Sequence, residues 1–186
     1  NKLLIQNQES VENLPKSMLD LQGLEQNVLV NPYVEKATVF STINGGLKTI
    51  IKQREPVARI VDKSSSYYVD SEGIKIPLSK NFSARVPLVS GLKSDKEIEE
   101  ITQLINEISF DDFLKKEIVG IQKNSKEEYV FDVRSGNYKV EFGKYSNSVV
   151  KFKKLKAFYN KAYKDETIHN YKNINVKYHN QVVCTK

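Results

Sequence analysis

The sequence is poor in the residues from which most metal and redox sites are built. Its 186 residues include one cysteine, Cys184, and two histidines, His169 and His179. A single cysteine excludes an internal disulfide, and a zinc site needs several Cys, His or carboxylate ligands that converge. The spacing of the two histidines matches no metal motif, so we expect both to be ordinary surface residues.

Long apolar runs and the usual catalytic motifs are also missing. No run approaches the roughly 18–20 apolar residues of a membrane-spanning helix. The sequence contains no Gly-x-Ser-x-Gly motif, no Walker-type loop and no Gly-x-Gly-x-x-Gly. The adjacent carboxylates of Asp111 and Asp112 would point roughly 100° apart on a helix, so they suit a charged first turn better than acid–base chemistry. We therefore predict a protein that is not an enzyme and has no catalytic residue, cofactor or metal.

Positive charge is present in excess and is concentrated in one segment. The net charge is +6, and residues 144–164 contain seven lysines and no acidic residue. Phe152, Leu155 and Tyr159 recur at helical spacing there, which predicts a helix over 148–163 that is packed by these three residues. Its lysines form either a solvated face or a surface for nucleic acid, phospholipid or an acidic protein. Because no nucleic-acid-binding signature accompanies them, we do not expect a nucleic-acid site.

The N-terminal third predicts a small α+β unit. Apolar residues at spacings of three and four over 13–34 indicate two short helices, and Asp20 is a suitable N-cap for the second. The segment Asn44–Gly46 then predicts a tight turn between two strands. Pro56 interrupts the extended stretch 48–62, and because proline cannot donate to a sheet ladder, we expect the chain to bend there.

The remaining sequence predicts a mixed β domain with helices. Strands separated by polar turns are expected over 57–90, a helix with a capping box at Ser94 and Glu97 follows, and 110–118 forms a shorter helix. Three strands over 118–142 precede the basic helix.

The closing segment "NINVKYHNQVVCT" is predicted to be one final strand at a sheet edge. Such an edge keeps one row of N–H and C=O groups free and can accept a strand from another chain. The residues predicted to bind a partner are Tyr178, His179, Asn180, Gln181, Val182 and Val183.

In their order and spacing these segments resemble the FtsQ/DivIB cell-division family, specifically the extracytoplasmic region of its Bacteroidetes-type members. The resemblance covers roughly residues 18–186. The matching residues are Pro32, Val34, Ala37, Val39, Arg54, Glu55, Pro56, Val57, Ala58, Tyr68, Asp70, Gly73, Val86, Pro87, Val89 and Gly91. The closing strand departs from the family pattern, with Asn175 where Asp is common and Lys177 where Arg is common.

The resemblance implies a non-enzymatic division protein on the periplasmic side of the inner membrane, tethered by a single span that precedes Asn1. It implies a partly truncated POTRA-like domain over 1–62 and a C-terminal β domain over 63–186 that ends in an exposed strand. The implied partners are FtsB/FtsL-type coiled-coil proteins at that strand and an upstream recruiter at the POTRA-like domain. Two other functions stay open from the residues alone: a POTRA-bearing secretion or outer-membrane assembly module, and a basic nucleic-acid-binding protein.

Overall fold

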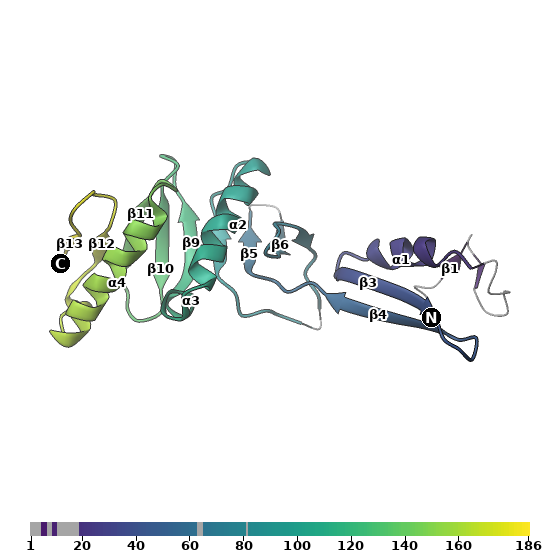
Figure 1. Ribbon diagram of the computed structural model, residues 1–186. Coiled ribbons are helices and arrows are strands. Elements are labelled where there is room, and N and C mark those ends of the chain that lie inside the picture. The colour runs from purple at the N-terminus through teal and green to yellow at the C-terminus, as the bar shows by residue number, and fades with distance from the viewer. Residues whose placement is uncertain (1–4, 7–8, 11–18, 63–64, 81) are drawn as a thin grey trace. The chain divides into compact units, whose positions relative to one another are not determined.

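Pro56, where the sequence predicts a bend, lies between two strands. Strand β4 (Leu47–Gln53) ends before Pro56 and β5 (Ala58–Val61) begins after it (Figure 1). The computed structural model describes residues 5–6, 9–10, 19–62, 65–80 and 82–186. The chain divides into two compact units, Asn1–Glu55 and Pro56–Lys186. The division falls earlier than the boundary expected after residue 62, because β5 pairs with strands of the second unit.

The first unit contains one helix and a hairpin. Helix α1 (Leu21–Leu29) begins at Asp20, whose carboxylate accepts a hydrogen bond of 2.9 Å from the Gly23 N–H, as predicted. The hairpin joins β3 (Val34–Ser41) to β4 through the predicted Asn-Gly turn, where Gly45 has a φ of 84°. Two short strands, β1 (Ile5–Gln6) and β2 (Glu9–Ser10), precede the helix. The first of the two predicted helices falls mostly on residues outside the described ranges.

The second unit is built on one mixed sheet of nine strands, in the order β13-β12-β11-β10-β9-β8-β5-β6-β7. The strands after β5 are β6 (Ser66–Val69), β7 (Lys75–Ile76), β8 (Leu88–Ser90), β9 (Ile118–Lys123), β10 (Tyr129–Val133), β11 (Lys139–Gly143), β12 (Asn173–Asn175) and β13 (Val183–Thr185). Three neighbouring pairs are parallel, β5 with β8, β8 with β9 and β11 with β12, and the other pairs are antiparallel. The predicted α+β class is therefore confirmed, and the predicted mixed β domain contains one large mixed sheet.

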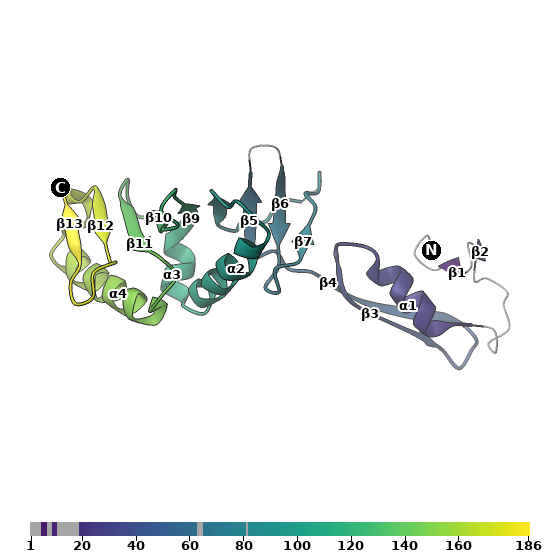
Figure 2. The same ribbon diagram turned by 90° about the horizontal axis from the view of Figure 1, so that it is seen from above.

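Helices supply two of the long connections and pack on one face of this sheet (Figure 2). Helices α2 (Lys96–Ser109) and α3 (Asp112–Glu117) connect β8 to β9, and α4 (Ser148–Lys164) with the short 3-10 helix η2 (Ile168–Asn170) connects β11 to β12. Alternate residues of each strand face the helices. Tyr129, Phe131 and Val133 of β10 are buried, for example, whereas Val130 and Asp132 between them are half-buried.

The basic helix follows the sequence prediction closely. Phe152, Leu155 and Tyr159 of α4 are all buried in the core of the second unit. The ring centroid of Phe152 lies 4.9 Å from that of Phe142 in β11, so the apolar stripe of the helix packs on aromatic side chains of the sheet.

The predicted closing strand is wrong in its extent. The segment forms two short antiparallel strands, β12 and β13, and residues 176–182 form the loop between them. The polar run from Lys177 to Gln181 separates the apolar residues of the two strands, which is the pattern of a hairpin rather than of one continuous strand.

Candidate partner-binding edge

Strand β13 ends the sheet at the C-terminal side (Figure 2). It pairs with β12 in the register Asn173↔Thr185, Ile174↔Cys184 and Asn175↔Val183. Within the described part of the chain no strand pairs with its other side, so one row of its backbone donors and acceptors faces outward. The geometry needed for strand addition is therefore present over residues 183–185.

The loop before β13 is shaped by one lysine of α4. The Lys154 ammonium donates to the carbonyl oxygens of Val176 at 2.9 Å and His179 at 3.4 Å, and also to that of Tyr178. The Asn175 side chain adds a turn by accepting from the Lys177 N–H at 3.0 Å. Three carbonyls that converge on one cation cannot belong to an extended strand, in which successive carbonyls point in opposite directions.

The six residues predicted to bind a partner therefore do not form one strand. Tyr178, His179, Asn180 and Gln181 are exposed and lie in the loop. Val182 is half-buried and packs against the core, so its side chain does not face outward. Only Val183 belongs to the edge strand.

Sequence reasoning missed the other two residues of the edge strand, Cys184 and Thr185, and the lysine that shapes the loop. The available signal was the polar run between Val176 and Val182.

The two departures from the family pattern contact the same carboxylate. Glu141 of β11 accepts hydrogen bonds from the side-chain amides of Asn173 and Asn175, and its Oε2 lies 3.0 Å from the Lys177 ammonium. The hydrogen bond from Asn173, followed by that from Lys177, holds the pKa of Glu141 below its usual value. An aspartate at 175 would place a second carboxylate against Glu141, so asparagine suits this arrangement and ties β12 to β11.

A buried hydroxyl cluster holds α4 against the sheet. The Glu117 carboxylate accepts from Tyr138 at 3.3 Å, from Tyr159 of α4 at 3.2 Å and from Ser135. Burial, together with hydrogen bonding in the case of Tyr159, raises the pKa of both tyrosines far above their usual value, so both stay protonated donors. Because Glu117 is buried and all three hydroxyls donate to its Oε1, we assign the cluster to stability.

Several α4 lysines serve structural roles rather than forming one open basic face. Lys154 holds the loop, Lys151 is buried and donates to the Lys144 carbonyl at 2.6 Å, and Lys156 forms an ion pair with Asp111. Asp111 also caps α3 by accepting from the N–H groups of Phe113 and Leu114 at 3.0 and 3.1 Å. The Asp111–Asp112 pair thus acts at a helix start, as predicted.

The described residues contain no group of three or more His, Cys, Asp or Glu side chains placed to hold a metal ion. Both histidines are exposed, as predicted. Among the described helices none is long and apolar enough to cross a membrane.

Comparison with known proteins identifies the second unit. A family model described as "FtsQ/DivIB, C-terminal related" matches residues 55–185. Among solved structures, the major extracytoplasmic domain of the trans isomer of the cell division protein DivIB from Geobacillus stearothermophilus is 15% identical, with a TM-score of 0.37, over 50% of this chain and 80% of that chain. No protein with a curated description matches the sequence.

The family match spans the whole nine-stranded sheet and its helices, and it ends at the last residue of β13. It agrees with the order of motifs read from the sequence, including the segment from Glu55 to Ala58 at its start. The chain belongs to the FtsQ/DivIB family of bacterial cell-division proteins.

Proposed function

We propose that this chain is the extracytoplasmic part of a non-enzymatic divisome scaffold, which binds other cell-division proteins from the periplasmic side of the inner membrane. Family membership supports a role in division through division-protein partners. On this proposal a single span precedes Asn1 and tethers the protein.

The observation that carries the proposal is the position of β13 at the end of the sheet, with one side unpaired in the described structure. We propose that an FtsB/FtsL-type coiled-coil partner adds a strand along Val183–Thr185. Each backbone hydrogen bond would contribute about 0.5–1.5 kcal/mol net, and side chains on alternate positions would add selectivity. The exposed loop residues Tyr178–Gln181 lie next to the strand and would contact the flanking part of the partner.

The first unit is proposed to be a POTRA-like domain that contacts an upstream recruiter. Support comes from its helix-and-hairpin composition and from the exposed side chains of β4, where Ile50 and Ile51 are 55% and 45% exposed. Exposed apolar residues on a strand are suited to protein contacts.

The proposal is tested by titrating the protein with the periplasmic segment of its coiled-coil partner and following amide hydrogen exchange. Protection is expected at whichever of the Cys184 and Thr185 amides faces away from β12 and in the adjoining loop, because strand addition engages the free backbone groups. Tight binding with unchanged exchange at β13 would show that the partner docks elsewhere.

The two alternative functions have less support. The second unit is a single nine-stranded sheet rather than a repeat of the first unit, which does not suit a tandem POTRA assembly module. Nucleic-acid binding is disfavoured because three α4 lysines are used internally, as described above. Fluorescence anisotropy with oligonucleotides near physiological salt decides the latter: sub-micromolar binding that is lost on charge reversal of Lys153 and Lys156 would support it.

A further inference from the structure

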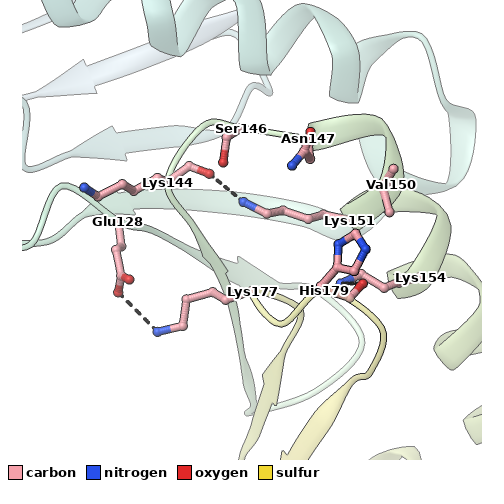
Figure 3. Close-up of a pocket in the computed structure, with 9 residues that line it drawn as sticks. All are labelled: Glu128, Lys144, Ser146, Asn147, Val150, Lys151, Lys154, Lys177 and His179. Carbon is pink, nitrogen blue, oxygen red and sulfur yellow. Dashed lines mark hydrogen bonds and ion pairs between the residues drawn. The ribbon is translucent and has the colours of Figure 1, made fainter.

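A cavity of about 300 Å³ lies beside the start of α4 (Figure 3). Its wall combines the loop before α4, the first two turns of that helix, the loop before β13 and one residue that precedes β10. We call it the α4–loop cavity. It is lined by Glu128, Lys144, Ser146, Asn147, Val150, Lys151, Lys154, Lys177 and His179.

Positive charge dominates this wall, with four lysines against one glutamate. The Lys177 ammonium is already paired, at 3.2 Å from Glu128 and 3.0 Å from Glu141. Lys151 and Lys154 instead donate to backbone carbonyls, and among the described residues neither forms an ion pair with a carboxylate. The cavity therefore carries positive charge that the described part of the protein does not neutralise.

Lys151 is the key side chain because it is only 7% exposed and lines the cavity. Its ammonium lies over the Phe142 ring, 4.8 Å from the ring centroid. Within the described residues it donates one hydrogen bond, to the Lys144 carbonyl, although an ammonium has three donors. Burial and the neighbouring Lys154 charge lower the pKa of Lys151. Burying an ammonium without an anion is unfavourable, so a bound anion would stabilise its charged form.

The start of α4 adds donors on the same side. Asn147 occupies the N-cap position, its side chain makes no capping hydrogen bond, and the first turn contains no acidic residue. The positive end of this 17-residue helix is thus left without a negative side chain. Ser146 and His179 contribute further polar groups from two different loops.

We infer that the α4–loop cavity binds a phosphate group, as free phosphate or as the headgroup of an anionic lipid. The polar groups of the wall come from separate elements and can therefore surround a tetrahedral anion. Lysine is a common phosphate ligand and acts as a point charge, so the lysines of this wall suit a phosphate group. This binding does not depend on the function proposed above, although His179 lines the cavity and also belongs to the loop that we propose to contact the partner.

The test is a calorimetric titration of the whole chain with inorganic phosphate, alongside the variants Lys151→Met and Lys153→Met. Lys153 lies on the same helix and is exposed outside the cavity, so it is a control matched for charge. Because a hydrogen bond to a charged group contributes about 1.5–3 kcal/mol, Lys151→Met should weaken phosphate binding about tenfold or more, and Lys153→Met less than about twofold. Circular dichroism checks that both variants fold.

Amide chemical shifts of the unaltered protein give a second readout, which remains if Lys151→Met fails to fold. Phosphate should shift the amides of Ser146 to Val150 most strongly. Capture by vesicles of phosphatidylglycerol, compared with vesicles of phosphatidylcholine, then distinguishes a lipid headgroup from free phosphate as the ligand. Capture by the anionic vesicles that depends on Lys151 indicates a headgroup, and phosphate binding without capture indicates free phosphate. Any of three results would overturn the inference. They are an equal loss of phosphate affinity in both lysine variants, amide shifts mainly outside Ser146 to Val150, and binding of a polyglutamate peptide but not of phosphate.

Discussion

The two ends of the nine-stranded sheet are finished in different ways. At one end β7 has only two residues, Pro77 follows it directly, and the next loop folds back so that the Ala84 N–H donates to the Tyr68 hydroxyl at 3.1 Å. At the other end β13 has no proline and no chain folded over its outer side within the described residues. Both edge strands are short, but a proline is a typical way to block an edge, so we assign β7 as the blocked end and β13 as the open end.

The largest effect is expected at the centre of the sheet, on which both ends depend. Gly91 follows β8 with a φ of 84°, and a Cβ atom there would clash with the backbone oxygen of Lys123 in β9. Gly91→Ala should lower the free energy of unfolding by about 2–4 kcal/mol, because backbone strain and the clash act together. Urea denaturation measures it.

Gly46→Ala is the control for Gly91→Ala. Gly46 is not among the glycines with positive φ, and the nearest atom to an added Cβ is the Thr42 hydroxyl oxygen at 3.2 Å. If Gly91→Ala lowers the free energy of unfolding no more than Gly46→Ala does, β8 and β9 can separate there without cost.

The second effect concerns the open end itself. Cys184→Pro removes a backbone donor in the middle of β13, and it should weaken partner binding by about tenfold or more whichever side that donor faces. Asn180→Pro lies in the loop and should change binding much less. Titration with the partner's periplasmic segment compares the two variants with Cys184→Ala. Stronger weakening by Asn180→Pro than by Cys184→Pro would restore residues 178–183 as the docking strand.

A smaller effect on stability is expected at acidic pH, where the contact between Asp111 and Lys156 of α4 weakens. The ion pair with Lys156, together with the α3 capping bonds, lowers the pKa of Asp111 below its usual value of 3.8. Since the folded pKa lies below the unfolded one, the stabilisation is complete above about pH 4 and is lost as the pH falls through the folded value. Asp111→Asn should cost about 1 kcal/mol at neutral pH and flatten this loss.

Denaturation between pH 2 and 7 tests the Asp111 prediction. The neighbouring Asp112→Asn is the control, because Asp112 is exposed at the same helix start. If stability depends on pH identically in the two variants, Asp111 does not stabilise the packing of α4.

The smallest effect is expected at the blocked end. Pro77→Ala removes the residue that stops β7, yet Pro77 is exposed, so the stability should change by less than about 0.5 kcal/mol. Partner binding should stay unchanged, since the partner is proposed to dock at the opposite edge. A clear change in partner affinity in this variant would contradict the assignment of β13 as the docking edge.

Local sequence patterns predicted most of the elements. The N-cap at Asp20, the Asn-Gly hairpin and the stripe of Phe152, Leu155 and Tyr159 each depend on residues close in sequence, and all three are present. The family resemblance rested on the order of such short segments, and the family match agrees with it.

What the sequence did not predict depends on contacts between distant residues. The closing hairpin requires Lys154 to reach carbonyls more than twenty residues away, and no local pattern encodes that contact. The earlier start of the second unit similarly reflects the 2.8 Å bond from the Val57 N–H to the Val69 carbonyl, which draws the chain after Pro56 into the large sheet.

The way Lys154 holds the loop before β13 has an evolutionary consequence. Its ammonium binds main-chain carbonyl oxygens, which every amino acid carries, so the shape of the loop does not depend on the side chains of Tyr178 and His179. Those exposed positions can change without loss of the fold, as is common in loops that are held by a rigid scaffold. Related chains could therefore diversify Tyr178–Gln181 to follow a changing partner, provided that the lysine on the helix is kept.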